Sequence, residues 1–352
     1  MLAMPLLGRC RTAMQTDHTM LTAAIQAVAT ACQLTRAVQS RLDVVATLTK
    51  DDRSPVTVAD LAAQAIVAIV LAEHLPNKAD RLVVGEEDAG TLREDGMDVI
   101  RRAVVETVQH WRPNASEDDI LDAIDHCNHD GTADEYWTLD PIDGTKGFLR
   151  NQQYAIALGR IKDGHVVHGV MGCPGLPIQQ HAQLDVPDPD GVMYAASAGE
   201  GAWEFAHADP EADRMRVQVR PADDERILRF CGSVEKAHSS RSDADRIAEH
   251  IGGVGDPVRL DSQCKYALVA RGQADAYLRL PTKAGYVEKI WDHAAGSIIA
   301  QEAGAIVSDI HGTPLDFSHG ALLQENRGVV TAIPGLHERL IEAISTLSIG
   351  TP

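Results

Sequence analysis

Two carboxylates stand three positions apart in a segment that could bind both a metal ion and a phosphate. Asp140 and Asp143 follow a short apolar run, and Pro141 between them fixes the direction of the chain. Gly144 and Thr145 come next and offer backbone N–H groups and one hydroxyl. Carboxylates beside a glycine turn suit Mg²⁺, and N–H groups just beyond them can hold phosphate oxygens. The alternative is a plain Asp-Pro/Asp-Gly turn between two strands.

Other acids stand where secondary-structure elements should begin or end. Glu86 follows the apolar residues 83–85, a pattern typical of a buried strand that ends in a turn. Asp292 and Asp60 each stand at the expected start of a helix. Asp60 could instead form a capping box with Thr57, and Asp292 could be an ordinary N-cap. Capping alone does not explain four acidic motifs in one chain.

These motifs carry a resemblance to the inositol monophosphatase superfamily of metal-dependent phosphatases. It rests on Gly-Glu-Glu at 85–87, Asp-Pro-Ile-Asp-Gly-Thr at 140–145 and Trp-Asp-His-Ala-Ala-Gly at 291–296. Longer matches make the chain similar to the 3′(2′),5′-bisphosphate nucleotidase family: Ser-Pro-Val-Thr at 54–57, Thr-Lys-Gly-Phe-Leu-Arg at 145–150, Val-Glu-Lys-Ala-His-Ser-Ser at 234–240, Leu-Asp-Ser-Gln-Cys-Lys-Tyr at 260–266 and Ala-Tyr-Leu-Arg-Leu-Pro at 276–281. The likeness runs from about Leu21 to Pro334 and is weak at 95–135 and 179–190.

The resemblance implies a fold and a metal site. The fold is an α/β sandwich of the inositol monophosphatase type, with an antiparallel sheet in an N-terminal α+β domain and a mostly parallel sheet in a C-terminal α/β domain. Two or three Mg²⁺ ions per site would neutralise phosphate charge and make a water nucleophilic. The implied ligands are Glu86, Asp140, the backbone carbonyl of Ile142, Asp143 and Asp292.

The resemblance also assigns catalytic and substrate-binding residues. Asp60 and Thr145 would orient and deprotonate the attacking water, since a hydroxyl can orient water while a carboxylate accepts its proton. His238 would contact the base, and Lys265 and Arg279 would hold the phosphate that is not cleaved. The substrate-binding set is completed by Gly144, Thr145, Ser262 and Asp292.

Judged from the residues alone, the basic and histidine positions have other readings. Lys265 and Arg279 could be surface ion-pair partners, because basic side chains are usually solvated. His238 could be an ordinary loop histidine. The extended motif matches are what favour the nucleotide-binding roles.

We therefore expect Mg²⁺-dependent hydrolysis of the 3′-phosphate of 3′-phosphoadenosine 5′-phosphate (PAP) to AMP and phosphate. The sulfated relative 3′-phosphoadenylyl sulfate (PAPS) is a second candidate substrate. An alternative keeps the chemistry and changes the substrate to inositol mono- or polyphosphates. A further alternative is a catalytically inactive nucleotide sensor, which predicts a broken ligand set. Here all the ligands, Asp60 and Thr145 are present.

Composition sets bounds on the class of protein. A chain of 352 residues with 44% hydrophobic residues can bury two modest cores. The net charge of −19 argues against general nucleic-acid binding. The six cysteines are scattered, which favours a reduced cytoplasmic setting, and no apolar run is read as a membrane span. We expect a monomer.

The organisation of the chain is predicted as a leader and two domains. Residues 1–18 contain Arg9 and Arg11 and no acid before Asp17, so they faintly resemble an organelle transit peptide. We favour instead a disordered leader, or a wrongly assigned start of translation. The metal-binding and catalytic domain is expected at 19–221 and the nucleotide-binding domain at 222–352.

Hydrophobic periodicity predicts the elements that position the motifs. An amphipathic helix is expected from Leu21 to Val45 and a second from Asp60 to about His74, followed by an acidic, partly helical insertion at 94–134. A hairpin is expected over 154–171. Strands are then predicted at 227–231, 258–260, 276–280, 305–308 and 328–332, alternating with helices at 243–250, 263–271, 292–303 and 336–345.

Overall fold

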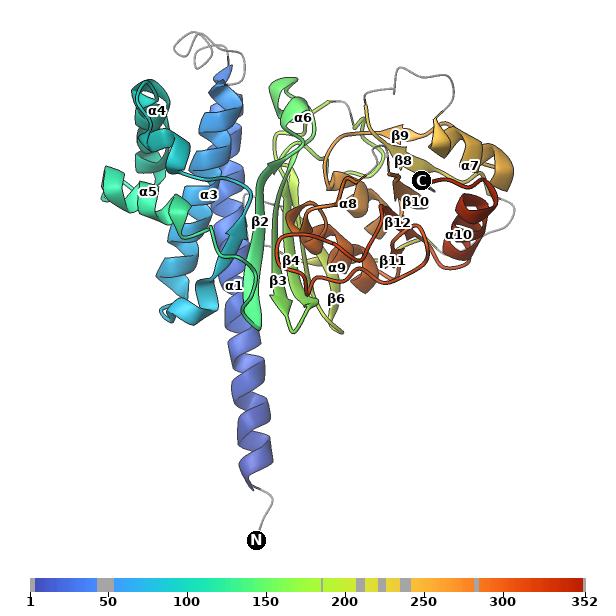
Figure 1. Ribbon diagram of the computed structural model, residues 1–352, viewed down its shortest axis with the longest axis horizontal. Helices are drawn as coiled ribbons and strands as arrows, with labels where there is room; N and C mark the ends of the chain where they lie inside the picture. The colour runs from blue at the N-terminus through green and yellow to red at the C-terminus, as the bar shows by residue number, and fades with distance from the viewer. Residues whose placement is uncertain are drawn as a thin grey trace.

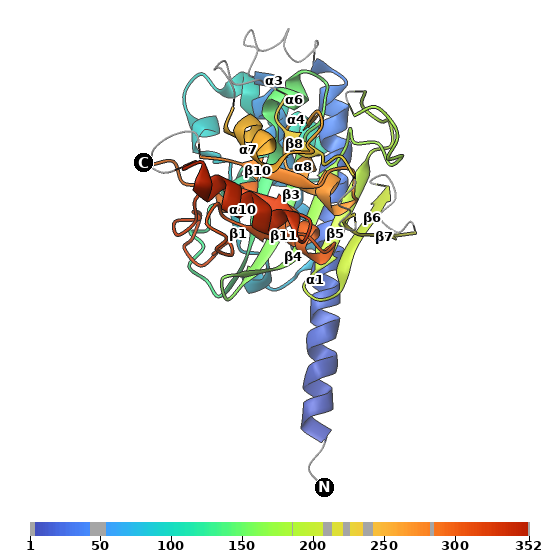
Figure 2. The same ribbon diagram turned by 90° about the vertical axis from the view of Figure 1, so that its right-hand side faces the viewer.

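A computed structural model describes residues 4–42, 54–184, 186–206, 213–220, 226–234, 242–281 and 285–350. Helices and two β-sheets alternate in layers, as Figure 1 shows from left to right. One pair of helices lies between the two sheets, and another covers the outer face of the second sheet (Figure 2). The paired helices are α1 (Met4–Gln39) with α3 (Ser54–His74), α8 (Cys264–Ala270) with α9 (Ala294–Glu302), and α7 (Asp243–Ile251) with α10 (Leu336–Thr346).

The first sheet follows the chain order and is antiparallel except at one edge. Strand β1 pairs with β2 in parallel, and every later neighbour pairs antiparallel. The predicted hairpin is confirmed as β3 and β4. The strands are β1 (Val83–Gly85), β2 (Glu135–Asp143), β3 (Ala155–Lys162), β4 (His165–Cys173), β5 (Val192–Ser197), β6 (Gly201–Ala206) and β7 (Met215–Val217).

The second sheet is mixed, so the prediction of a mostly parallel sheet is wrong in part. Its order is β11-β12-β10-β8-β9, with β9, β8 and β10 parallel and β12 antiparallel to both of its neighbours. A segment without a helix joins β11 to β12, and such a connection returns the chain antiparallel. The strands are β8 (Phe230–Gly232), β9 (Val258–Arg259), β10 (Ala276–Arg279), β11 (Ile306–Ser308) and β12 (Val329–Ala332).

The predicted boundary near Pro221 falls on residues outside the described part of the chain. On either side of it, β7 ends at Val217 in the first sheet and β8 begins at Phe230 in the second. Helix α9 nevertheless packs against β3, β4 and β5 of the first sheet. Helix α9, from the second half of the chain, therefore contacts the sheet that the first half forms.

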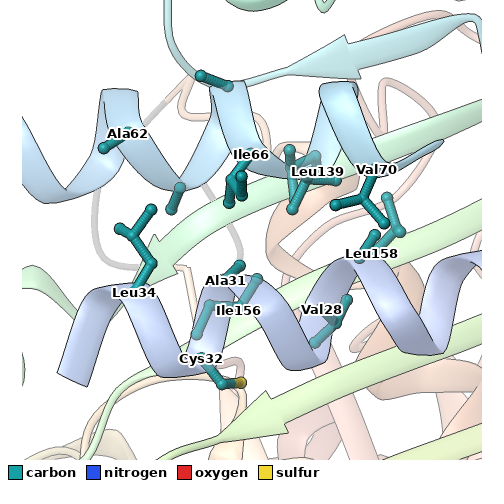
Figure 3. Close-up of a cluster of buried hydrophobic side chains, with 14 of the residues drawn as sticks. Val28, Ala31, Cys32, Leu34, Ala62, Ile66, Val70, Leu139, Ile156 and Leu158 are labelled. Carbon is teal, nitrogen blue, oxygen red and sulfur yellow. The ribbon is translucent and has the colours of Figure 1, made fainter. Parts of the chain in front are cut away.

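A dry core lies between α1, α3 and the first sheet (Figure 3). Small side chains let the two helices approach closely, while branched ones fill the space above the strands. The buried residues labelled in the figure are Val28, Ala31, Cys32 and Leu34 of α1, Ala62, Ile66 and Val70 of α3, and Leu139, Ile156 and Leu158 of the sheet.

Two predicted helix boundaries need correction. Helix α1 begins at Met4 and not near Leu21, so residues 4–18 continue the helix and do not form a separate leader without structure. Helix α3 begins at Ser54 and not at Asp60. Pro is well tolerated in a first helical turn, and the burial of Val56 and Val58 in the core stabilises this turn ahead of the Ala-rich sequence. A targeting role for the N-terminus stays a prediction.

The acidic insertion is helical, as predicted. Helices α4 (Asp98–Trp111) and α5 (Glu117–Asp125) pack on α3, on the side away from the second sheet (Figure 1). Short 3₁₀ turns precede them at η1 (Lys78–Arg81) and η2 (Gly90–Arg93). The insertion therefore extends the first core with residues such as Val104 and Ile120.

Helix α3 is also long and apolar enough over Val56–His74 to cross a bilayer, which the sequence reading missed. That window is 67% buried within the protein, because α1 and the sheet lie on one side of the helix and α4 and α5 on the other. A core helix that is mostly covered by its neighbours can have the same composition as a membrane span.

Candidate active site

Strand β2 ends in the acidic motif, and its last residues leave the regular ladder. Asp140 pairs with Ala157 and Asp143 with Ala155, so a β-bulge lies between them and Ile142 has no partner in the ladder. Pro141 explains this, because proline cannot donate a ladder hydrogen bond. Bulges re-aim side chains next to functional sites.

The turn after the strand depends on a glycine. Gly144 has φ 93° and ψ 45°, a left-handed conformation that glycine adopts without strain. A Cβ there would lie 2.9 Å from the Cβ of Ser262, which comes from the other half of the chain. Thr145 is the first residue of the short helix α6 (Thr145–Leu149), whose first N–H groups have no intrahelical partner.

The predicted metal ligands from separate elements influence one another electrostatically. Asp140 is 2% exposed, and its Oδ1 atom has no hydrogen-bond partner among the described residues. Burial, reinforced by the charges of Asp143, Glu86 and Asp292, raises the pKa of Asp140 well above its ordinary value. Three stretches of chain, at the ends of β1 and β2 and just before α9, thus bring carboxylates to one place.

The other acids show the same crowding. Desolvation and the charge of Glu87 raise the pKa of Glu86 to about 7. Burial, opposed by His293 and reinforced by Asp143, raises the pKa of Asp292 to about 6. Asp60 is buried inside α3, and burial together with Glu87 raises its pKa well above the usual range. Asp60 is the seventh residue of its helix and therefore does not cap it, contrary to the alternative reading.

This donor set fits a divalent cation. An unpaired buried carboxylate oxygen is costly, and mutual repulsion among Glu86, Asp140, Asp143 and Asp292 adds to that cost. Hard oxygen donors of this kind are the ligands of Mg²⁺ and related ions, whose charge reverses the local electrostatics.

A cavity of about 240 Å³ opens beside these acids. Lys265 lines it although its side chain is 6% exposed, so it is not the surface residue of the alternative reading. Its ammonium lies 5.3 Å from the centre of the Tyr277 ring, and burial lowers its pKa. The lining residues are Asp143, Gly144, Thr145, Lys146, Ser233, Asp261, Ser262, Lys265, Tyr277, Arg279 and Asp292.

Arg279 is paired with Asp292, which also lines the cavity, and with Glu288, which does not. Its Nε donates to Oε2 of Glu288 at 2.8 Å and its Nη2 donates to Oδ2 of Asp292 at 3.3 Å. Glu288 also lies 3.3 Å from Nε2 of buried His293, whose Nδ1 is 2.8 Å from the hydroxyl of Tyr266. Hydrogen bonds that link Glu288 to His293 and His293 to Tyr266 therefore help to fix the orientation of the Arg279 guanidinium.

Glu288, Asp292 and His293 also place one ligand-type atom each within 4.8 Å of one another. Glu288 is already engaged by Arg279, and His293 by Tyr266. We therefore assign this group to the positioning of Arg279, with Asp292 shared between it and the acidic cluster.

The structure brings Ser262 to the site and leaves His238 undescribed. Ser262 has φ 68°, an unusual conformation for a non-glycine residue, and its Oγ accepts from the N–H of Cys264 at 3.2 Å. Strained backbone of this kind gathers at ligand-binding sites. His238 lies outside the described residues, so its role stays a prediction.

Sequence reasoning missed several residues that shape the site. The backbone N–H of Gln263 donates to Oδ2 of Asp143 at 2.7 Å, and Asp261 pairs with Arg150. Asp261 also lines an adjoining, larger cavity of about 500 Å³. Asp261, Gln263 and Tyr277 all stood within quoted motifs, and that was the only signal that could have found them.

Comparisons with known proteins show the family of this chain. The sequence pattern of the inositol monophosphatase family matches residues 16–348. A 3′(2′),5′-bisphosphate nucleotidase of Schizosaccharomyces pombe is 40% identical over 344 residues, which cover 94% of this chain and 96% of that protein. One of Oryza sativa is 40% identical over 336 residues, covering 92% and 93%.

Solved structures support the fold alone. An inositol monophosphatase from Anabaena (Nostoc) sp. PCC 7120 has a TM-score of 0.58 at 19% identity, covering 94% of this chain and 97% of that one. CysQ from Bacteroides thetaiotaomicron, a bacterial member of the inositol monophosphatase family, has 0.57 at 20%, covering 89% and 96%. The predicted α/β sandwich is thereby confirmed. The chain belongs to the inositol monophosphatase family and, within it, to the 3′(2′),5′-bisphosphate nucleotidases.

Proposed function

We propose that this protein is a Mg²⁺-dependent phosphatase that removes the 3′-phosphate of PAP to give AMP and phosphate. The observation that carries the proposal is one cavity lined by side chains of opposite charge. Asp143 and Asp292 belong to the crowded carboxylates and are here called the metal wall, and Lys265 and Arg279 are called the basic wall, with Arg279 in contact with Asp292 at 3.3 Å. A substrate with two separated phosphates suits such a cavity. Relatives named 3′(2′),5′-bisphosphate nucleotidase support the same substrate.

The metal wall would consist of Glu86, Asp140, the carbonyl of Ile142, Asp143 and Asp292, with two or three Mg²⁺ ions. When bound, such ions neutralise charge on the phosphate and favour ionisation of water near neutral pH. The raised pKa values of these acids support that assignment, because a nearby cation would favour their charged forms.

The chain's own groups would supply position and proton transfer. The N–H groups of Gly144 and Thr145 hold the scissile phosphate at the start of α6. The Thr145 hydroxyl orients the attacking water, and Asp60 accepts its proton. Asp60 is buried, and the charges of Glu87 and Glu86 act on it, which supports its place beside the proposed metal ligands.

The basic wall, formed by Lys265 and Arg279, would bind the rest of the nucleotide. Lys265 and Arg279 hold the 5′-phosphate, Ser262 lines the passage between the walls, and His238 contacts the base. A buried ammonium and a guanidinium held in one orientation lose little freedom on binding an anion. PAPS keeps the 3′-phosphate and is proposed as a second substrate.

The division into a metal-binding domain at 19–221 and a nucleotide-binding domain at 222–352 belongs to the same proposal.

We further propose that the protein acts as a monomer in the cytoplasm and does not bind nucleic acid or membranes. The net charge of −19 supports the absence of nucleic-acid binding, because a polyanion is repelled by an acidic surface.

The position of the cleaved bond tests the proposal. Purified protein is incubated with PAP and Mg²⁺, and the nucleotide product is identified by chromatography against 3′-AMP and 5′-AMP. We expect 5′-AMP with one equivalent of phosphate, and no product when a chelator replaces Mg²⁺. Release of 3′-AMP would contradict the assignment of the two walls.

A further inference from the structure

The strand that carries Glu86 has little support of its own. Strand β1 contains three residues, and Glu86 beyond it donates one backbone hydrogen bond to Leu139 at 3.2 Å. Glu87 has left the ladder altogether. A metal ligand that follows so short a strand needs other contacts to fix its position, because metal sites tolerate only small displacements of their ligands.

Gln64 supplies those contacts from α3. Its side chain is fully buried. Nε2 donates to the carbonyl of Glu87 at 2.7 Å, and Oε1 accepts from the N–H of Glu87 at 3.1 Å. The side-chain amide therefore pairs with one residue as a neighbouring β-strand would, and it continues the ladder where the backbone no longer does.

The same amide reaches the acidic insertion. Nε2 of Gln64 also donates to the carbonyl of Ile124, at the end of α5, at 3.2 Å. Just beyond, the N–H of Gly85 donates to Cys127 at 2.6 Å, and that of His129 donates to Val83 at 3.0 Å. The end of the insertion is thus the outer neighbour of β1, and Gln64 joins it to the Glu86–Glu87 segment.

The position before Glu86 leaves room for this contact. A Cβ on Gly85 would lie 2.5 Å from Oε1 of Gln64 and 2.9 Å from the Cβ of Cys127. A side chain at 85 would therefore displace the amide. Asp60 stands four residues before Gln64, one turn earlier on the same face of α3. One rigid helix therefore carries both the proposed proton acceptor and the amide that holds the ligand segment.

We propose that Gln64 is a positioning residue. It holds the Glu86–Glu87 segment in the place that metal binding requires and fixes the position of this segment relative to Asp60. This rests on the proposed function only in taking Glu86 as a metal ligand, and not on PAP as the substrate. The competing explanation is that Gln64 merely satisfies buried backbone groups, in which case its loss would lower stability without a specific effect on metal binding.

The test compares full-length variants in metal binding and in local order. Gln64→Met keeps the volume and removes all three hydrogen bonds. Thr35→Val is the matched control, because Thr35 is a buried polar residue of the same core, bonded to Tyr154 at 3.0 Å and without contact to the ligand segment. Mn²⁺ binding to chelator-treated protein is measured by calorimetry, amide exchange at Glu87 by NMR, and the unfolding temperature by calorimetry.

We expect Gln64→Met to weaken Mn²⁺ binding by roughly tenfold to hundredfold, the usual effect of removing a residue that orients a ligand. The Glu87 amide should exchange faster, while KM for PAP at saturating metal stays near the wild-type value. Thr35→Val should lower the unfolding temperature and leave metal binding unchanged. Equal Mn²⁺ affinity in Gln64→Met and wild type would overturn the proposal.

A second variant keeps the test decisive if Gln64→Met does not fold. Gln64→Glu retains an oxygen that can accept from the Glu87 N–H and lacks the amide donor, so we expect an intermediate loss of Mn²⁺ affinity; wild-type affinity in this variant would overturn the proposal. Wild-type protein that binds Mn²⁺ without hydrolysing PAP would contradict the proposed substrate and leave the comparison of Gln64 variants valid.

Discussion

Arg279 donates from Nε to Oε2 of Glu288 at 2.8 Å, and this ion pair fixes the guanidinium from outside the lining of the cavity. The same guanidinium reaches Asp292, which belongs to the acidic cluster, at 3.3 Å. The residue proposed to read the second phosphate is therefore coupled to a proposed metal ligand. A substitution of Arg279 should therefore also affect the acidic cluster through Asp292.

Asp140→Asn should lower kcat by orders of magnitude while the fold is kept. A neutral amide binds Mg²⁺ poorly, and the charge neutralisation at phosphate depends on that site. Removing one crowded charge should also raise the unfolding temperature of the metal-free protein. Phosphate release and thermal unfolding check this, with Glu106→Gln on the exposed side of α4 as the control. Near-normal turnover at ordinary Mg²⁺ would disprove the metal assignment.

Asp60→Ala and Thr145→Ala should each lower kcat more than they raise KM. Both residues are assigned to the transition state and not to substrate binding. The double variant should be little worse than the worse single one, because the residues act as a unit. Thr145→Ser keeps the hydroxyl and serves as the matched control. Independent, fully multiplicative losses in steady-state kinetics would count against this pairing.

Arg279→Ala should weaken the use of PAP far more than the use of an inositol monophosphate. A charge-assisted contact is worth about 1.5–3 kcal/mol, so kcat/KM for PAP should fall roughly tenfold to hundredfold. Some loss on the smaller substrate is expected, since Arg279 also contacts Asp292.

Lys265→Ala should act in the same direction and less strongly, because an ammonium is a point charge and not a fork. Arg112→Ala, which breaks an ion pair with Glu73 on the far side of α3, should leave both substrates unaffected. Equal losses on PAP and inositol monophosphate would mean that Arg279 and Lys265 support the fold or the metal site only.

His168 should make stability depend on pH. Burial, together with the charge of Arg160, lowers its pKa to about 4, although Asp17 and Glu135 act in the opposite direction. Because its unfolded pKa is higher, the unfolded state binds more protons between these values, and stability is lost as pH falls. The loss from this group should be about 2 kcal/mol between pH 7 and pH 5.

His168→Gln should remove that pH dependence, while retaining a group that can bond to Ser197 as Nδ1 of His168 does at 3.0 Å. Urea unfolding of both proteins at the two pH values measures the difference. If the variant and the wild type lose equal stability between pH 7 and pH 5, His168 is not buried in its neutral form.

The sequence predicted the site well where chemistry is encoded locally. Asp140 and Asp143 lie at the end of a strand and precede a turn, and Pro141 and Gly144 fix that geometry locally. The hairpin at β3 and β4 is equally local, because its two strands and its turn residues are adjacent in the chain.

Features that depend on distant contacts were not predictable in this way. An acid often caps a helix, so the sequence predicts a start of α3 at Asp60, whereas tertiary packing of Val56 and Val58 extends the helix back to Ser54. The direction of β12 depends on how the segment from β11 returns. The pairs between Gln64 and Glu87 and between Arg279 and Glu288 join distant or irregular segments, which no periodicity reveals.

The most direct test of the central claim is the ratio of kcat/KM for PAP to that for an inositol monophosphate, measured by phosphate release from the same preparation with Mg²⁺. We predict a ratio well above one, by roughly the tenfold to hundredfold that one charge-assisted contact to the second phosphate supplies. We also predict that Arg279→Ala brings the ratio down toward one. A wild-type ratio at or below one would contradict the proposal that this cavity reads a nucleotide with two phosphates.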